Sequence, residues 1–359
     1  MSDTNGCELT LQKAQILSVA TAVPPFVIEQ RDAAVFLNET FAGRFPDFDR
    51  IAGVFMTAGI ERRRAVKPIE WFLQPLGWPE RTAAYLEGAS ALFVAAARRA
   101  LDGAGLSAAS VDTVVTVSST GIATPGLEAL VAAELGFGPG IERVPVFGLG
   151  CAGGVSGLSI AARLAQSRPG SVVLLVAVET CTLSFRADKL TKANIVASAL
   201  FGDGAAACVL RAGAGQGLEV ESADQHTWPG TLDIMGWSVD EEGLGVIFDR
   251  SIPVFAGEHF GPAVHGMLAR SGLSLEQVGR FVCHPGGAKV VSALERALAI
   301  PPGLLADERA VLAEFGNMSA PTVFFVLERA LQTGLPRRTL LTAMGPGFSA
   351  SIATLLAPA

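Results

Sequence analysis

The stretch VPVFGLGCAGGVSGLSIAARLA, residues 144–165, gives the strongest indication of the fold. An apolar run ends at glycines, a cysteine follows at position 151, and a helical pattern begins directly after it. Unpaired N–H groups and the positive end of the helix dipole at such a position favour the thiolate form of Cys151. Cysteine is also commonly buried as a small apolar side chain, so this stretch alone leaves a nucleophile and a core residue as equal alternatives.

The same layout returns in the second half of the chain. One strand-like run ends just before Ser119, and Cys151 follows Ser119 by 32 residues. Another ends before His284, and Asn317 follows His284 by 33 residues. Cys151 and Asn317 each follow a glycine and precede an apolar helical segment. These spacings predict a duplicated α/β unit whose equivalent strand-to-helix corners bring the three side chains to one site.

Length and composition are consistent with two α/β halves around a large core. The chain has 359 residues, of which 50% are hydrophobic. The glycine-rich stretch RAGAGQG, residues 211–217, is the best candidate for a boundary. We therefore predict an N-terminal half, 1–213, with the cysteine, and a C-terminal half, 214–359, with the histidine and the asparagine.

Composition also excludes several classes of protein. The five cysteines have no paired spacing, which argues against a disulfide framework or a zinc site and for a reducing compartment. The N-terminus lacks the apolar core of a signal peptide, and no apolar run is long enough to span a membrane. A formal charge of −7 argues against nucleic acid as the main partner. We predict a cytoplasmic protein.

Five short motifs occur in a fixed order along the chain. They are GCAGG at Cys151, ALFGDGAAA around Phe201, HPGG at His284, GNMSAPTV at Asn317 and GPGFS at 345–349. In this order the chain resembles the type III polyketide synthases of bacterial type, in the chalcone and stilbene synthase family. The resemblance implies a thiolase-like fold, a duplicated α/β arrangement in αβαβα layers, and a homodimer.

The resemblance also implies a reaction. Cys151 would carry an acyl group from an acyl-CoA starter, and malonyl-CoA would extend it by decarboxylative Claisen condensation. His284 would pair with the thiolate, and His284 and Asn317 would donate hydrogen bonds to the developing enolate oxygen. Phe201 would act as a gate between the CoA tunnel and the acyl cavity. This chemistry needs no metal and no redox cofactor.

Taken singly, the same residues have ordinary structural interpretations. A lone histidine is more often structural than catalytic, and Asn317 stands where a helix N-cap is expected. Phe201 lies in an apolar, alanine-rich stretch, where core packing is the usual role of a phenylalanine. The catalytic assignments therefore depend on the resemblance.

The acyl pocket departs from that of the plant enzymes. The side chains at Ser119, Cys181, Ser184, Thr124 and Val246 are smaller than those the plant family usually carries there. A roomier apolar cavity suits an aliphatic starter and an alkylpyrone or alkylresorcinol product, with Trp237 limiting its depth. The resemblance assigns the pocket to Ser119, Thr124, Cys181, Ser184, Trp237, Val246, Ser319, Gly345, Pro346, Gly347 and Phe348.

The entrance for coenzyme A is less well defined by sequence. The resemblance places Arg50, Gly286 and Gly287 there, but of the basic residues that the family carries at this entrance only Arg50 keeps a positive charge. Three alternatives remain open: a ketoacyl-ACP synthase III, which shares the three catalytic residue types; a non-catalytic partner subunit of the same fold; and a papain-type protease, whose signature around the nucleophile this chain lacks.

Overall fold

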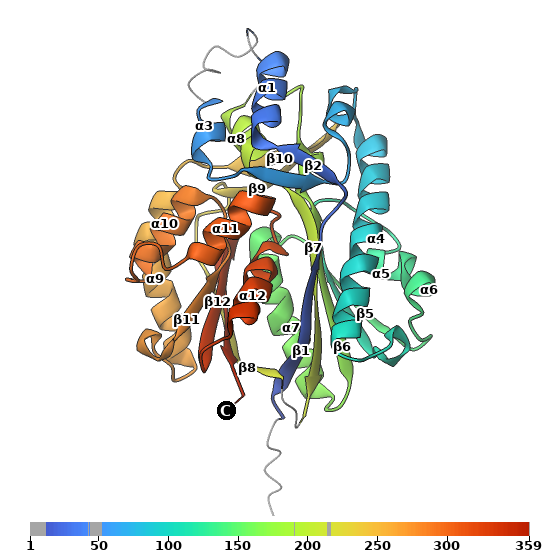
Figure 1. The fold of residues 1–359 in the computed structure, drawn as a ribbon, viewed down its shortest axis with the longest axis vertical. Helices are drawn as coiled ribbons and strands as arrows, with labels where there is room; N and C mark the ends of the chain where they lie inside the picture. Colours follow the sequence, from blue (N-terminus) through green and yellow to red (C-terminus); the bar gives the residue numbers. More distant parts are fainter. Residues whose placement is uncertain (1–11, 42, 44–51, 190, 214–216, 359) are drawn as a thin grey trace, which may run out of the picture.

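The computed structural model describes residues 12–41, 43, 52–189, 191–213 and 217–358, and within them one nine-stranded sheet runs through the molecule (Figure 1). Its first five strands form the N-terminal part of the sheet. In spatial order they are β1 (Ala14–Ala22), β7 (Asp203–Ala212), β6 (Val172–Thr180), β4 (Thr113–Val117) and β5 (Glu142–Val146). Every residue of β6 is buried, as expected of an apolar strand covered on both faces.

The remaining four strands form the C-terminal part of the sheet. They are β8 (Leu218–Thr227), β13 (Ser349–Leu356), β12 (Arg338–Gly345) and β11 (Arg280–Cys283). The two parts meet where β1 pairs with β8 over only two residue pairs, Gln15 with Glu219 and Ile16 with Leu218. The predicted boundary at 213/214 lies beside this junction and stays a prediction, because 214–216 fall outside the described residues.

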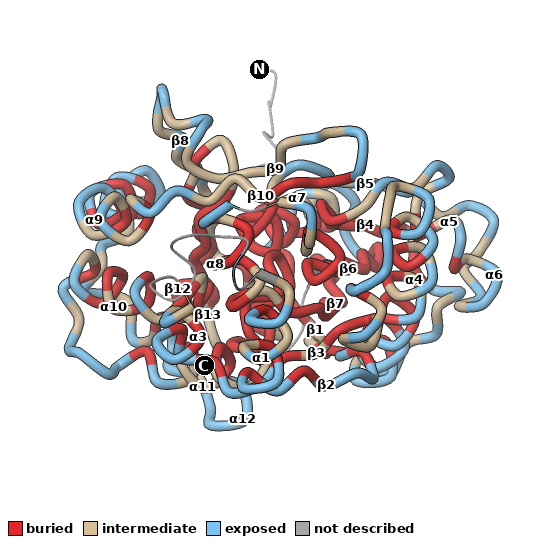
Figure 2. The backbone as a smooth tube through the Cα atoms, turned by 90° about the horizontal axis from the view of Figure 1, so that it is seen from above, coloured by how far each residue is buried: buried red, intermediate tan, exposed pale blue. Residues whose placement is uncertain are grey.

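Helices form three layers around the two parts of the sheet (Figure 1). Between the parts lie α7 (Gly153–Ser167) and α12 (Thr322–Thr333), whose apolar side chains join one core with strands of both parts. On the outside, α4 (Trp78–Gly103) covers the N-terminal part, and α9 (Ile252–Arg270) and α10 (Ala288–Ala297) cover the C-terminal part. The predicted αβαβα layers are confirmed, and Figure 2 shows the buried backbone concentrated in the central layers.

The internal duplication is visible in the strand directions. In the N-terminal half β4 and β6 are parallel, and α7 precedes β6 along the chain. In the C-terminal half β11 and β12 are parallel, and α12 precedes β12. Each unit ends with an antiparallel neighbour, β7 in one and β13 in the other. Equivalent corners therefore face the same central layer.

Smaller elements cover the end of the molecule drawn uppermost in Figure 1. Two antiparallel strand pairs lie there: β2 (Phe26–Glu29) with β3 (Arg62–Ala65), and β9 (Met235–Asp240) with β10 (Gly243–Phe248), which form a hairpin. The other helices and 3₁₀ turns of the described chain are α1 (Gln30–Phe41), α3 (Val54–Thr57), η1 (Ile69–Leu73), η2 (Ala108–Ser110), α5 (Leu127–Leu130), α6 (Ala132–Leu135), η3 (Gly150–Ala152), η4 (Cys181–Ser184), α8 (Lys192–Leu200), η5 (Leu275–Gln277) and α11 (Ala306–Phe315).

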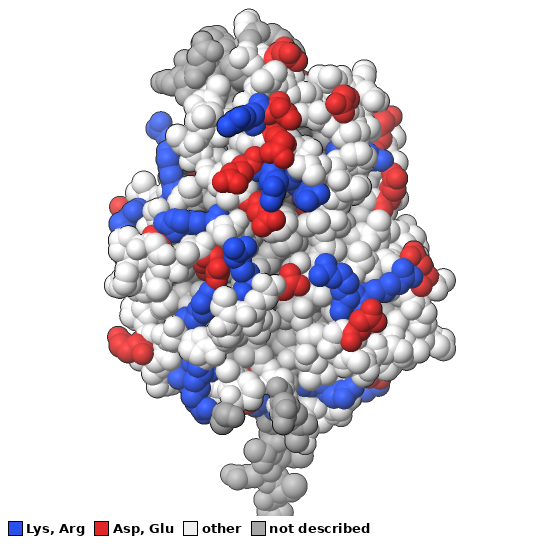
Figure 3. Space-filling model, in the orientation of Figure 1, with Lys and Arg blue, Asp and Glu red and all other residues white. Residues whose placement is uncertain are grey.

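Charged side chains of both signs are interspersed on the face shown in Figure 3. Among the residues that the structure describes, no helix combines the length and the apolar character needed to cross a bilayer.

Candidate active site

Cys151 lies at the N-terminal corner that the sequence predicts. It sits in η3, immediately before α7, and its side chain is buried. The preceding Gly150 has φ +47°, and a Cβ there would lie 2.7 Å from the ring of Pro346. A glycine is needed at this position both for the backbone conformation and for the close approach of the 346 turn.

Asn317 reaches the same place from the C-terminal half. Its backbone N–H donates to the oxygen of Leu200 at 2.8 Å, and its own oxygen accepts from the N–H of Gly202 at 3.0 Å. Gly316 before it has φ +70°, and a Cβ there would lie 2.7 Å from the Leu200 oxygen. The backbone thus ties Asn317 to the segment that carries Phe201.

The side chain of Asn317 points at the cysteine. Its Oδ1 lies 4.0 Å from the Sγ of Cys151 and accepts the N–H of Ser319 at 2.8 Å, while its Nδ2 donates to the oxygen of Gly286 at 3.3 Å. Ser319 has φ +61°, a strained value for a residue other than glycine and one that is often found at functional sites. The helix α12 begins five residues later and is not capped by Asn317, so the N-cap interpretation is wrong.

His284 follows β11 directly, as the sequence predicts, and lines the same cavity as Cys151 and Asn317. Its backbone N–H donates to the oxygen of Thr342 at 2.8 Å. The ring is buried, yet neither Nδ1 nor Nε2 has a hydrogen-bond partner among the described residues. Buried polar atoms are rarely left without a partner, so an unpaired imidazole beside a cavity points to an atom that a ligand supplies.

Burial shifts both titrating groups of the site toward their neutral forms. Burial raises the pKa of the Cys151 thiol to about 11, although hydrogen bonds with the side chains of Ser319 and Asn317 oppose the shift. Burial lowers the pKa of His284 to about 4. Desolvation therefore opposes the thiolate form of Cys151 that the helix N-terminus favours. The thiol needs a neighbouring proton acceptor, and a neutral imidazole is one.

A second cavity adjoins the first at Cys151, and its empty space, counted together with the open solvent at its mouth, is about 460 Å³. Most of its lining is apolar, and Phe201 contacts the ring of Trp237 edge-on at a centroid distance of 6.2 Å. Seven of the residues that the sequence assigned to the acyl pocket or the gate lie on its wall: Ser119, Cys181, Phe201, Trp237, Val246, Ser319 and Pro346.

Other assigned residues lie elsewhere. Thr124 is exposed on a surface loop, and Phe348 is fully buried in the outer core against Trp228 and Phe255. Ser184 lines a neighbouring cavity instead of the one at Cys151. The assignment of Phe348 to the pocket wall is wrong, because its ring packs in the outer core. Thr124 does not line the cavity at Cys151 in the described chain, and Ser184 lines the adjoining cavity, which shares Cys181 and Phe201 with it, so both assignments stay predictions.

The glycines that the sequence analysis assigned to the acyl pocket and to the CoA entrance lie in several different places. Gly345 packs against the backbone of Leu149 and the side chain of Ala152 behind the cysteine, and Gly347 lies in the open turn between β12 and β13. Gly286 lies on the wall of the His284 cavity, and Gly287 directly precedes α10. Arg50 falls outside the described residues, so its role stays a prediction.

The sequence analysis missed a buried carboxyl group close to the site. Glu179 accepts the N–H of Ser119 at 2.9 Å and the hydroxyl of Thr120 at 2.7 Å. Burial raises its pKa to about 8, and in its ionised form it raises the pKa of Cys151. A signal was present: Glu179 is the one charged residue in the apolar run VVLLVAVET of β6, and a buried charge in such a strand needs a reason.

Comparison with known proteins places the chain in a family. Residues 79–214 match the N-terminal domain of chalcone and stilbene synthases, and residues 219–354 match the C-terminal domain. The chain is 36% identical to the 1,3,6,8-tetrahydroxynaphthalene synthase of Streptomyces peucetius subsp. caesius, covering 95% of this chain and 92% of that protein. It is 32% identical to the alpha-pyrone synthesis polyketide synthase-like Pks18 of Mycobacterium tuberculosis, covering 94% of this chain and 89% of the relative.

A solved structure agrees in fold over nearly the whole length. The 1,3,6,8-tetrahydroxynaphthalene synthase of Streptomyces coelicolor A3(2), a bacterial type III polyketide synthase, superimposes with a TM-score of 0.91 at 27% sequence identity, covering 96% of this chain and 99% of that one. The chain therefore belongs to the chalcone and stilbene synthase family, as a bacterial-type type III polyketide synthase, a condensing acyltransferase that depends on malonyl-CoA.

Proposed function

We propose that the chain loads an aliphatic acyl-CoA starter on Cys151, extends it with malonyl-CoA, and closes the product to an alkylpyrone or alkylresorcinol. The observation that carries the catalytic part is the convergence of Cys151, His284 and Asn317 on one buried cavity, with both ring nitrogens of His284 unpaired among the described residues. No step of this proposal uses a metal or a redox cofactor.

Loading begins with proton transfer. His284, neutral because burial lowers its pKa, accepts the proton of the Cys151 thiol, and the resulting ion pair offsets the burial cost of each charge. The thiolate attacks the starter carbonyl, the bond to the CoA sulfur breaks, and the departing CoA thiolate takes the proton. The acyl group is then a thioester of Cys151.

Extension uses two hydrogen-bond donors, His284 and Asn317. Malonyl-CoA loses CO₂, and the negative charge passes to its thioester oxygen as an enolate. The Nε2–H of His284 and the second N–H of the Asn317 amide, whose first N–H already donates to Gly286, suit that oxygen. The enolate carbon attacks the acyl carbonyl on Cys151, the sulfur leaves, and the chain is longer by two carbons.

The shape of the cavities favours a long apolar starter. Cys181 and Phe201 line both the cavity at Cys151 and another cavity beneath α1, so these two side chains form a shared wall. The cavity beneath α1 is lined mainly by apolar side chains, among them Leu37, Phe72 and Phe185. An alkyl chain that starts on Cys151 and passes this wall gains burial that a short starter cannot.

Filling this wall is expected to change starter preference. In Cys181→Phe, kcat/KM for dodecanoyl- to palmitoyl-CoA falls about 10²-fold relative to that for butyryl-CoA, because each methylene kept out of an apolar site loses about 0.8 kcal/mol. Cys181→Ser keeps the volume and is expected to keep the wild-type preference. Competition assays with a panel of acyl-CoAs measure the ratio.

Four other results would each contradict a part of the proposed function. An unchanged preference in Cys181→Phe contradicts the route beneath α1. Release of 1,3,6,8-tetrahydroxynaphthalene from malonyl-CoA alone would show that this chain shares the activity named for its Streptomyces relative and would contradict the alkyl starter. Use of malonyl-ACP but not malonyl-CoA would favour a ketoacyl-ACP synthase III, and absence of any decarboxylation by folded protein would favour a non-catalytic subunit.

We also propose a homodimer that forms at strand β5. This strand is an edge of the large sheet, and the residues beside it include the exposed Phe147 and Ile122, which line an apolar cavity with Pro145. An open strand edge next to exposed apolar side chains is suited to pairing with a second copy.

Charge at the centre of this surface is expected to separate the subunits. Phe147→Glu raises the dimer dissociation constant at least about 10²-fold, because a desolvated carboxylate replaces an apolar anchor. Leu304→Glu, an equally apolar and exposed side chain between α10 and α11, leaves the dimer intact. Sedimentation velocity measures the dimer dissociation of both variants. A wild-type chain that sediments as a monomer would contradict the proposal.

A further inference from the structure

The β9–β10 hairpin covers the cavity at Cys151. Its two strands pair only with each other among the described strands, so the main sheet does not hold them. Trp237 lies opposite Val246 in the hairpin, and both line the cavity. Met235 and Phe248 pair two positions further along the hairpin and line it too. The position of this hairpin therefore sets the height of the space above the cysteine.

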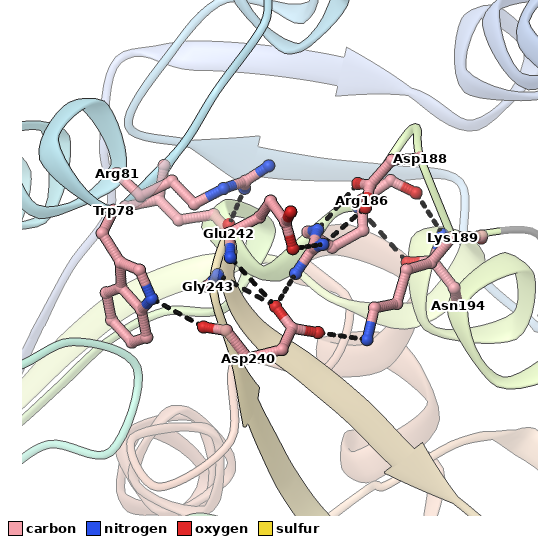
Figure 4. A network of polar contacts seen from close by, with 10 residues as sticks. Trp78, Arg81, Arg186, Asp188, Lys189, Asn194, Asp240, Glu242 and Gly243 are labelled. Carbon is pink, nitrogen blue, oxygen red and sulfur yellow. Dashed lines mark hydrogen bonds and ion pairs between the residues drawn. The ribbon is translucent and has the colours of Figure 1, made fainter.

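Polar contacts hold the turn of the hairpin against the N-terminal half (Figure 4). The guanidinium of Arg186 donates from Nη1 to Oδ1 of Asp240 at 2.8 Å and from Nη2 to Oε2 of Glu242 at 3.2 Å. Lys189 pairs with the other oxygen of Asp240. Trp78, at the start of α4, donates from its indole Nε1 to the backbone oxygen of Asp240 at 2.8 Å. We name these five residues the turn latch.

Arg186 is unusually buried for a charged side chain that binds a surface turn. Its side chain is only 1% exposed, whereas Asp240 is 28% and Glu242 54% exposed. Asp188 also binds the guanidinium through two oxygens, at 2.7 and 2.5 Å. Hydrogen bonds from Lys189 and Arg186 hold the pKa of Asp240 well below its usual range. A buried guanidinium is stable only while its partners are charged and in place.

The latch joins two walls of the same cavity. Arg186 lies two residues after η4, the turn that contributes Cys181 to the wall below the hairpin. Asn194 donates from Nδ2 to the backbone oxygen of Arg186 at 2.6 Å, and Arg81 donates to the backbone oxygen of Leu183. Both contacts fix the η4 segment in place. A shift of the latch would therefore move the hairpin relative to the opposite wall.

Apolar packing does not replace these contacts at the turn. A cavity remains between the turn and α4, and Trp78, Arg81 and Gly243 line it. In Figure 4 the charged groups of the turn and of the segment around Arg186 point at one another across this region. The turn is about 10 Å along the strand from Trp237, at about 3.3 Å per residue.

We propose that the turn latch positions the β9–β10 hairpin over the acyl cavity and thereby sets how many malonyl units are added before the product is released. The inference rests on the proposed function, because it takes the cavity at Cys151 as the space in which the chain grows. Arg186, Asp240 and Trp78 are positioning residues here; none of them lines the cavity at Cys151.

The test compares two substitutions in one turn. Asp240→Asn removes the charge that Arg186 and Lys189 bind but keeps an oxygen for the turn N–H groups of Glu242 and Gly243. Glu241→Gln removes the same charge from a residue that forms no ion pair with the other described residues. In Asp240→Asn, the share of products that differ from the main product by one malonyl unit is expected to rise at least about threefold, because the ion pairs with Arg186 and Lys189 are lost. Glu241→Gln keeps the wild-type distribution.

Hydrogen exchange supplies a second readout. Peptides covering 235–248 are expected to exchange at least about fivefold faster in Asp240→Asn than in Glu241→Gln, since the hairpin depends on the latch for its position. Trp78→Phe removes the other anchor without changing charge and is expected to shift the products in the same direction, so it keeps the test decisive if Asp240→Asn folds poorly.

Acylation of Cys151, measured by mass in the same samples, separates the two proposals. An acyl adduct in every variant with an unchanged product distribution in Asp240→Asn and Trp78→Phe would overturn the latch alone. Absence of the adduct in the wild type would overturn the proposed function, and the latch with it.

Discussion

Cys151→Ala is expected to lower polyketide formation by at least about 10⁴-fold while leaving malonyl-CoA decarboxylation within about tenfold of the wild type. The difference follows from the division of roles in the site. Cys151 is the group that holds the growing chain, whereas the donors suited to the enolate oxygen are His284 and Asn317. Release of labelled CO₂ and product formation, measured in parallel, check both halves of the result.

The chain offers a matched control for this substitution. Cys283 is also a buried free cysteine and precedes His284 in sequence, but its side chain belongs to the core between the sheet and the outer helices. Cys283→Ala is expected to cost stability and little activity. Polyketide formation that survives in Cys151→Ala and disappears in Cys283→Ala would contradict the assignment of the nucleophile.

His284→Ala and Asn317→Ala are each expected to slow malonyl-CoA decarboxylation by about 10²- to 10³-fold, the usual cost of removing one preorganised donor to an oxyanion. The fold-loss in decarboxylation rate of the double variant is expected to be smaller than the product of the two single fold-losses, because both donors bind one oxygen. His265→Gln, an exposed histidine on α9, serves as the control and keeps wild-type rates.

The pH profile of decarboxylation follows from the burial of His284. Burial lowers its pKa to about 4, so the imidazolium form becomes populated only as the pH falls toward that value. Protonation of His284 therefore changes the wild-type rate by less than about twofold between pH 6 and 8. A loss of activity with a midpoint near pH 6.5 in the wild type, absent in the His284 variant, would contradict this.

Much of the fold follows from short-range patterns. The strand at 14–22 and the two strand-to-helix corners are where apolar runs and glycines predict them, because a strand buried on both faces reads as an unbroken apolar run. The repeated spacing of Cys151 and Asn317 relative to the strands before them was enough to bring the two halves together in the prediction.

The predictions differ from the structure where packing between distant parts of the chain decides the position of a side chain. Nothing in the local sequence of GPGFS shows that Phe348 turns into the outer core while Pro346 faces the cysteine. The thiolate prediction for Cys151 counted the helix end and not the depth of burial, which needs the whole fold to be known. The turn latch joins Asp240 to Arg186, 54 positions away, and to Trp78, 162 positions away, and its charges look like ordinary surface residues in the sequence.

Intact-mass analysis of the wild type and Cys151→Ala, each incubated with acyl-CoA esters from butyryl to palmitoyl, tests the central claim most directly. The account predicts a single acyl adduct in the wild type, strongest for the long chains and chased by malonyl-CoA, and no adduct in Cys151→Ala. An adduct of equal size in Cys151→Ala, or none with any ester in the wild type, would contradict it.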